Sequence, residues 1–432
     1  MNSAISIFLP IAVALFAGLM LTRLFKVMGL KLPDVTCYLI AGLIIGPYCI
    51  GRLGVPGIGF TSLEEVEEVS LISEAALGFI AFSIGSEFRM SELKHTGRAT
   101  VVIGILQAAT ATLLVDIALI CLHFILGNEV LPLSVAITMG AIAAATAPAA
   151  TLMVVRQYKA SGPLTSLLLP IVALDDAVGL VIFSVSFGIA LAIQGGEISV
   201  FSVGIDPMVE IVASILLGGL LGYILAQLEK LFHSNRNRLS LTISFVFLTI
   251  AISHLEIPVG PVTISFSSLL ICMMLGTVFC NVAEFSKDIM DRADKWTVPL
   301  NCCFFVLSGA ELELGVFAHP EYVLIGVVYI IVRSLGKYLG ARESSKAVGC
   351  DHKVVKYLGV TLLPQAGVAL GMCAQAGALG AAEGSIVRNI TLFGVLIYEL
   401  FGPTLTKIAL TKAGEITPAP TEGRKRFAPQ QQ

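Results

Sequence analysis

The sequence predicts an all-α polytopic membrane protein, because of its composition, its long apolar segments and the charges between them. Hydrophobic residues make up 56% and charged residues 13% of the 432 residues, and the mean hydropathy is +0.90. Soluble globular chains contain about 25% charged residues. At ~20 residues per span, the chain has room for roughly a dozen membrane helices and for no sizeable soluble domain.

About thirteen apolar segments follow one another along the chain. The N-terminus lacks a basic region and its apolar run is too long for a signal peptide, so residues 5–26 are expected to be a retained first span. The segments are 5–26, 34–49, 69–87, 99–126, 132–155, 163–193, 206–227, 238–253, 260–282, 298–314, 320–340, 354–379 and 386–411.

The connecting loops alternate in charge. If every segment crosses, the basic clusters all lie on one side, which the positive-inside rule makes cytoplasmic. We therefore expect a cell-membrane (plasma or inner-membrane) protein with its N-terminus outside and its C-terminus in the cytoplasm. The basic clusters are Arg23/Lys26/Lys31, Arg89/Lys94/Arg98, Arg156/Lys159, Lys230/Arg236/Arg238, Lys287/Arg292/Lys295 and Arg342/Lys346/Lys353/Lys356.

An odd number of segments fits two six-helix repeats of opposite orientation joined by one linking helix. We expect repeat one at about 5–193, the linking helix at 206–227 and repeat two at about 238–411. Together they form one transmembrane domain, 1–411. Residues 412–432 contain prolines, a basic triplet and three terminal glutamines, and they predict a disordered cytoplasmic tail.

Two segments at corresponding places in the repeats carry helix-breaking chemistry. Thr146-Ala147-Pro148 interrupts segment 132–155, and Pro364-Gln365-Ala366-Gly367 interrupts segment 354–379. For either segment alone, a simple proline kink is an equally good interpretation. Because the two interruptions correspond, we predict discontinuous helices around a midplane ion site.

Charged side chains inside the spans are costly and therefore need a reason. Adjacent carboxylates near the middle of segment 163–193 are the most costly. The candidates are Glu74, Asp116, Asp175, Asp176, Glu210, Arg333, Lys337 and Glu399.

Successive side chains on a helix point ~100° apart, so Asp175 and Asp176 are expected to have different roles. One aspartate would be the main ligand of a cation such as Na⁺, and the other a second ligand, a proton carrier or the partner of a basic residue. Thr146 and freed backbone carbonyls would supply further oxygen ligands. Competition of protons and cation for the same carboxylates is sufficient for exchange. The alternative is a purely structural carboxylate pair.

Arg333 and Lys337 lie one helical turn apart in segment 320–340 and offer a counter-charge. We expect Arg333, at mid-depth, to pair with an aspartate. Lys337 lies closer to the cytoplasmic end, where it either extends towards the surface or is the basic partner instead. Glu399 occupies the place in the last segment that the aspartates occupy in 163–193. Glu399 and Gln365 are secondary site candidates.

Several segments together resemble the monovalent cation:proton antiporter superfamily. The resemblance covers nearly the whole membrane region and, through the twin aspartate, favours its electrogenic branch. It implies the antiporter fold, an ion-binding and proton-carrying diad at Asp175 and Asp176, and a basic residue at Arg333, with Lys337 as the rival. It also implies a homodimer with an elevator-like core domain. The segments are CYLIAGLIIGP, ALGFIAFSIGSEFRMSELK, AAATAPAATLMVV, LPIVALDDAVGLVIFS, CFFVLSGAELEL and LLPQAGVALGM.

Two features depart from the pattern of these relatives. Some carry an acidic residue after the threonine where this chain has Ala147, which leaves the cation ligands open. Potassium efflux relatives often carry a cytosolic nucleotide-binding domain, and we expect none here.

We therefore expect an electrogenic Na⁺(Li⁺)/H⁺ antiporter that moves two protons per cation, with K⁺/H⁺ exchange as the alternative. An organic-anion/Na⁺ symporter is disfavoured because buried aspartates would repel an anion, and a cation channel because a pore needs no titratable pair. No enzymatic activity, cofactor or nucleic-acid partner is expected. The nine cysteines, without CxxC spacing, predict packing rather than disulfides or a metal.

Overall fold

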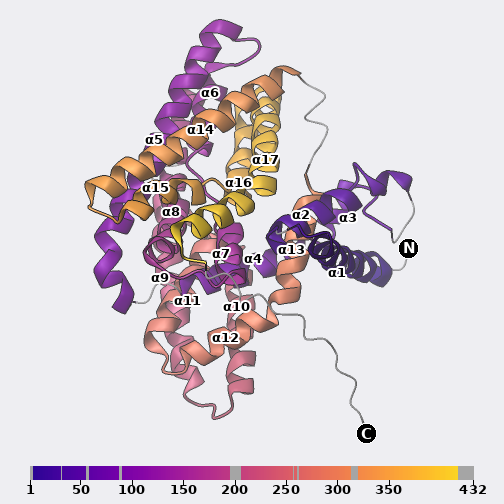
Figure 1. Ribbon diagram of the computed structural model, residues 1–432, viewed down its shortest axis with the longest axis vertical. Helices are drawn as coiled ribbons and strands as arrows, with labels where there is room; N and C mark the ends of the chain where they lie inside the picture. Colours follow the sequence, from indigo (N-terminus) through magenta and orange to yellow (C-terminus); the bar gives the residue numbers. More distant parts are fainter. Residues whose placement is uncertain are drawn as a thin grey trace.

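A computed structural model describes residues 3–30, 32–54, 58–86, 90–194, 206–255, 257–259, 262–312 and 320–416. Almost all of this chain is helical (Figure 1). The helices are α1 (Ser3–Val27), α2 (Asp34–Ile45), η1 (Ile50–Leu53), α3 (Leu63–Glu67), α4 (Ser70–Gly85), α5 (Met90–Leu126), α6 (Leu133–Ile142), α7 (Pro148–Gln157), α8 (Pro163–Ile193), α9 (Asp206–Glu229), α10 (Asn235–Ser253), α11 (Ser268–Val282), α12 (Ser286–Trp296), α13 (Val298–Ala310), α14 (Pro320–Ala347), α15 (His352–Thr361), α16 (Gly367–Gln375), η4 (Ala376–Leu379) and α17 (Ala381–Ala413).

Each predicted apolar segment contains at least one helix, and the all-helical membrane architecture is confirmed. Within the described ranges, seven helices are long and apolar enough to cross a membrane, and five apolar helices are shorter. The remaining segment is α10, which begins with the polar sequence NRNR. The predicted breaks account for two of the short cases, because α6/α7 and α15/α16 each divide one segment into two half-helices.

Several short elements were not predicted: the helices η1 and α3, a two-stranded hairpin and the helix α12. β1 (Ile257–Val259) and β2 (Val262–Ile264) pair antiparallel in a short hairpin before α11. The helix α12 lies between α11 and α13 and is strongly amphipathic, with Ile289, Met290 and Ala293 buried and its charged residues on the other side. A short, half-polar helix has no apolar run, so hydropathy does not reveal it.

Local sequence explains where many helices begin and end. Ser62, Ser267 and Asp351 cap α3, α11 and α15 by accepting a backbone N–H with their side-chain oxygens. Pro148 and Pro163 occupy first-turn positions of α7 and α8, where no N–H donor is needed.

The helices pack in two groups. The first group contains α5–α8 and α14–α17, and α5 and α14 run side by side over much of their length (Figure 1). The second group contains α1, α2, α4 and α9–α13. Residues of one group thus come from both halves of the sequence, as expected of two intertwined repeats.

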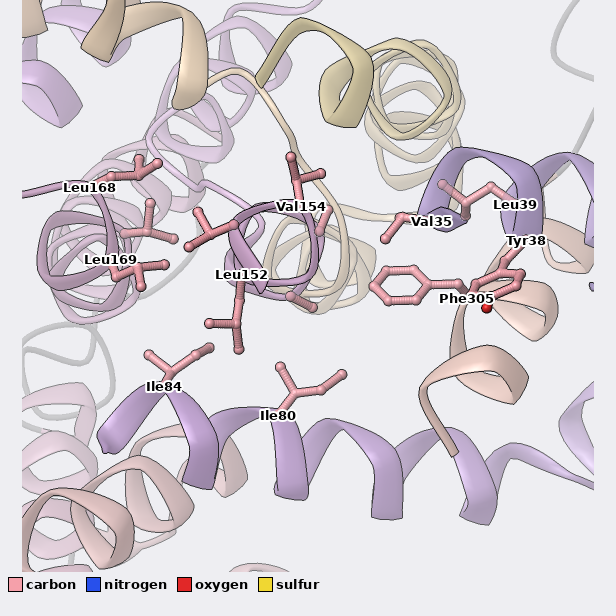
Figure 2. Close-up of a cluster of buried hydrophobic side chains, with 14 of the residues drawn as sticks. Val35, Tyr38, Leu39, Ile80, Ile84, Leu152, Val154, Leu168, Leu169 and Phe305 are labelled. Carbon is pink, nitrogen blue, oxygen red and sulfur yellow. The ribbon is translucent and has the colours of Figure 1, made fainter. Parts of the chain in front are cut away.

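The half-helix α7 lies at the border of the two groups. Figure 2 shows Leu152 of α7 between Leu169 of α8 and Ile84 of α4. On the other side of α7, Val35 of α2 and Phe305 of α13 belong to the same buried cluster. The border between the groups is therefore largely apolar.

The end of α17 folds back onto the start of α8. The Glu415 carboxylate accepts hydrogen bonds from the Leu164 N–H at 2.6 Å, the Thr165 N–H at 2.8 Å and the Thr165 hydroxyl at 2.6 Å. The predicted tail was expected to begin at residue 412, but α17 continues to Ala413 and Glu415 is buried. An anionic side chain at a helix N-terminus satisfies free N–H groups, which holds this part in place. Residues 417–432 lie outside the described chain.

Candidate functional site

The two helix breaks cross each other in the first group. α6 ends at Ile142 and α7 begins at Pro148, while α15 ends at Thr361 and α16 begins at Gly367. The Ala147 N–H donates to the Pro364 carbonyl at 2.8 Å, so the two non-helical stretches contact each other directly. Proline has no N–H and disfavours a helix before it, which explains why both stretches unwind at these residues. The breaks leave backbone carbonyls without helical partners.

Arg333 of α14 satisfies several of these carbonyls. Its guanidinium donates to the carbonyl oxygens of Ala143 at 3.1 Å, Ala145 at 2.6 Å and Leu363 at 2.8 Å. The side chain is fully buried, and its charge lies 4.4 Å from the ring centre of Tyr398. The planar guanidinium carries five N–H donors, so it can bind carbonyls of both breaks at once.

Asp175 of α8 is fully buried beside the first break. Its carboxylate accepts a hydrogen bond from the Thr146 hydroxyl at 2.5 Å and forms an ion pair with the Lys337 ammonium at 3.0 Å. The Gln107 side-chain amide also donates to this carboxylate. Lys337 donates in addition to the Thr146 hydroxyl at 2.9 Å and to the Ala144 carbonyl at 2.5 Å.

The close approach of α14 to α5 brings Lys337 and Gln107 together. A Cβ atom added to Gly340 would lie 2.7 Å from the Gln107 Cα, and one added to Gly336 would lie 2.7 Å from the Ala111 Cα. Only glycine at these two positions, four residues apart, lets the backbones come this close.

The chain is similar to known proteins over most of its length. The family model described as sodium/hydrogen exchanger, transmembrane, matches residues 11–412. The chain belongs to the sodium/hydrogen exchanger family. The resemblance predicted from the sequence is thereby confirmed.

Individual members of the family are distant in sequence. The chain is 23% identical over 383 residues to the K(+)/H(+) antiporter subunit KhtU of Bacillus subtilis, covering 88% of each chain. It is 26% identical over 345 residues to the high-affinity Na(+)/H(+) antiporter NhaS3 of Synechocystis, covering 74% of this chain and 68% of the relative. Two structures of the sodium proton antiporter MjNhaP1 from Methanocaldococcus jannaschii share its fold, at 20% identity. Their TM-scores are 0.65 and 0.67; they cover 94% and 95% of this chain, and 95% and 98% of the antiporter.

The expected partner of the aspartates needs a correction. Arg333 was preferred as the partner of an aspartate, with Lys337 as the alternative, but it is Lys337 that is fully buried on Asp175. Arg333 instead binds the carbonyls of the two breaks. Both residues lie on one face of α14, and their depth alone does not reveal that unwound carbonyls compete for the guanidinium.

The other predicted residues have separate positions. Asp176 continues α8 beside Asp175, but its side chain lies outside the described part of the structure. Gln365 donates to the Ile142 carbonyl at 2.9 Å and hydrogen-bonds the Tyr329 hydroxyl, so it stabilises the crossed breaks away from Asp175. Glu399 is buried in α17 and lines a cavity described below.

The weaker candidates lie outside the cluster. Glu74 forms an ion pair with His254 in the second group. The Asp116 carboxylate lies directly against Gly140 of α6. Glu210 lines the same cavity as Glu399.

Gln107 was not predicted to be a site residue. It is a fully buried amide that also donates to the Gly104 carbonyl at 3.0 Å. The sequence signal is a single amide inside the apolar run VVIGILQAATATLLV. An amide carries no charge, so its burial costs less than that of an ionisable side chain and indicates a functional site less strongly.

Two cavities lie at opposite ends of the helix bundle. The first, here called the Glu399 cavity, has a volume of about 470 Å³ and reaches Ala147 and Pro148 at the start of α7. The second has a volume of about 780 Å³ and is lined by Arg156 of α7 and Asp294 of α12. Arg156 and Asp294 form an ion pair, and the Ser83 hydroxyl donates to the same carboxylate at 2.7 Å.

Proposed function

We propose that this chain exchanges a monovalent cation for protons across the membrane, with Asp175 at the centre of the ion site. The observation that carries this proposal is the buried cluster of Asp175, Lys337 and Thr146 beside two crossed helix breaks. Carboxylate, hydroxyl and carbonyl oxygens are the ligands that hard cations prefer. A carboxylate also binds protons, so one site can serve both ions. Membership of the sodium/hydrogen exchanger family supports the same function.

Sodium is the preferred cation in this proposal, and lithium is expected to substitute for it. The family description and the names of NhaS3 and MjNhaP1 support sodium. Potassium is the alternative, because KhtU is described as a subunit of a K(+)/H(+) antiporter and aligns over 88% of this chain.

In the proposed cycle, the Lys337 ammonium occupies Asp175 when no cation is bound. An arriving cation takes over the oxygens of Asp175 and Thr146, and the Lys337 ammonium leaves the carboxylate and releases one proton to water. Arg333 keeps its carbonyl contacts throughout and so preserves the geometry of the two breaks. Asp176, next in α8, is proposed as the second group that exchanges a proton, which gives two protons per cation and electrogenic transport.

Alternating access is proposed to occur by movement of the first group against the second. The apolar cluster around α7 supports this idea, since apolar side chains can move past one another without breaking hydrogen bonds (Figure 2). A homodimer in the cell membrane would hold the second group still, with the N-terminus outside and residues 412–432 at the cytoplasmic face.

The test is exchange in proteoliposomes with an imposed pH gradient. Addition of Na⁺ or Li⁺ should collapse the gradient, and a response to K⁺ alone would select the alternative. Asp175→Asn should abolish the response while the protein still elutes as one folded species. If none of the three cations moves protons, the antiport proposal is wrong.

Electrogenicity is tested separately with a membrane potential set by a potassium gradient and valinomycin. Because two positive charges exchange for one, a potential negative on the side that receives the protons should accelerate Na⁺ exchange. If the rate of Na⁺ exchange does not depend on the membrane potential, the antiport proposal still holds but the stoichiometry of two protons per cation is wrong.

A further inference from the structure

The Glu399 cavity contains a buried carboxylate that the proposed cycle does not use. The cavity lies at the end of the bundle where α13 ends and α9, α11 and α17 begin. The predicted topology makes this end extracellular. Glu311, at the end of α13, is exposed and lines both this cavity and a neighbouring surface pocket, so it marks the entrance.

Glu399 is the buried acid of this cavity. Its exposed fraction is only 7%, and within the described chain it has no hydrogen-bond or ion-pair partner. The preceding residue, Tyr398, belongs to the other side of α17, where its hydroxyl donates to the Ile330 carbonyl at 2.7 Å. A buried carboxylate without a partner is costly unless something neutralises it.

The backbone adds a further polar group at the same depth. Pro403 lies inside α17, four residues after Glu399. Proline has no N–H, so it cannot donate the helical hydrogen bond to the Glu399 carbonyl. Both the side chain and the carbonyl of Glu399 therefore depend on a partner other than the helix.

The inner wall of the cavity leads towards Asp175. Ala147 lines the cavity, and its neighbour Thr146 donates to the Asp175 carboxylate. Leu180, one helical turn beyond Asp176 in α8, lines the cavity as well. The break before α7 thus contacts both the cavity and the ion site.

We propose that Glu399 is a proton-transfer residue on the route between the outer surface and the Asp175 site. The proposal rests on the antiport function proposed above. The Glu399 acid gives its proton through cavity water to the site, and the carboxylate so formed takes a new proton from water at the entrance near Glu311. Each step breaks one O–H bond and forms another, and no other reactant is needed.

A proton suits this position better than a metal cation. A hard cation needs several oxygen ligands, whereas a proton needs one. The cavity wall around Glu399 is mainly apolar and includes Leu392 and Val395 of the same helix. Oxygen-bearing side chains, among them Glu210, Ser308, Glu311 and Gln375, also line the cavity. The Na⁺-binding measurement below therefore decides between a proton and a cation at Glu399.

The experiment compares Glu399→Gln, Glu399→Asp and the control Glu343→Gln, whose parent side chain is exposed at the far end of α14. In proteoliposomes, Glu399→Gln should slow Na⁺/H⁺ exchange about tenfold when the compartment facing the cavity is alkaline and protons are scarce. The loss should shrink at acidic pH, and Glu399→Asp should restore part of the rate. Equilibrium Na⁺ binding to the purified protein should stay within about twofold of the parent value.

A second readout does not depend on transport. Infrared difference spectra between acid and alkaline pH should lose one protonated-carboxyl band in Glu399→Gln and keep it in Glu343→Gln. A Glu399→Gln rate and pH profile equal to those of the parent protein would overturn the proposal. Loss of Na⁺ binding as complete as in Asp175→Asn would also overturn it, by making Glu399 a cation ligand. If the parent protein exchanges no cation, the antiport proposal falls and this inference falls with it.

Discussion

At the scale of single residues, two basic side chains one turn apart on α14 have different tasks. Lys337 is a compact charge that reaches one carboxylate oxygen, one hydroxyl and one carbonyl. Arg333 binds three carbonyls from both broken segments. In the proposed cycle a cation replaces the first arrangement, whereas the second holds the backbone of the two breaks together.

Substitutions should separate these tasks. Arg333→Ala leaves three buried carbonyls without donors, at about 1–3 kcal/mol each, so we expect a large drop in the melting temperature of the detergent-solubilised protein. Lys337→Ala should shift the pH profile of exchange and should also destabilise, by roughly 3 kcal/mol or more, because the Asp175 charge loses its partner.

The informative comparison is the double variant Lys337→Ala with Asp175→Asn, which removes both charges. Its melting temperature should recover towards that of the parent protein, because no unpaired buried charge remains. An equally low melting temperature in the double variant would contradict the ion pair as the cause.

At the scale of elements, the position of the site depends on how closely α14 packs against α5. Gly336 and Gly340 line this contact, and Gln107 lies opposite Gly340. The helix breaks act in the same region, because they free the carbonyls that Arg333 and Lys337 bind. Close packing and unwinding together make one polar centre inside an apolar bundle.

Gly340→Ala should disturb this centre. The added methyl group would meet the Gln107 backbone at 2.7 Å, so the two helices must move apart. We expect a stability loss of about 1–3 kcal/mol and a weaker apparent affinity for the cation in the exchange assay. Gly97→Ala is the matched control, since a Cβ there meets nothing within 4 Å. Equal behaviour of the two variants would refute the packing argument.

At the scale of the whole molecule, polar contacts connect the two groups at several places along a border that also contains a large apolar cluster. The Arg156–Asp294 ion pair joins α7 to α12 near one end. The Thr36 and Thr404 hydroxyl oxygens lie 3.5 Å apart and join α2 to α17. If the first group moves against the second during exchange, these contacts must break and re-form.

A disulfide across the border tests this movement. In the double variant Thr36→Cys/Thr404→Cys, oxidation should stop exchange and a reductant should restore it. The single variants and the parent protein, which contains nine free cysteines, are treated in the same way as controls. Full exchange by the quantitatively cross-linked protein would exclude movement of these two helices against each other.

Much of the fold could be predicted because it depends on local chemistry. Apolar segments of spanning length form helices, and Pro148 and Pro364 interrupt two of them. Pro10, Pro170 and Pro403, in contrast, lie inside continuous helices. The amphipathic helix α12 and the hairpin before α11 were missed because neither has a long apolar run.

The sequence by itself determined that this is a membrane protein with two interrupted helices and with two adjacent aspartates in an apolar helix. Only the tertiary structure decided that Lys337 rather than Arg333 binds Asp175, that Gln107 completes the contact and that Glu399 faces a cavity. Spans and breaks follow from neighbouring residues and from the cost of charge in the bilayer. A hydrogen-bond partner depends on which distant backbones approach each other, and here that is decided by the packing of α14 on α5 and by the crossing of the two breaks.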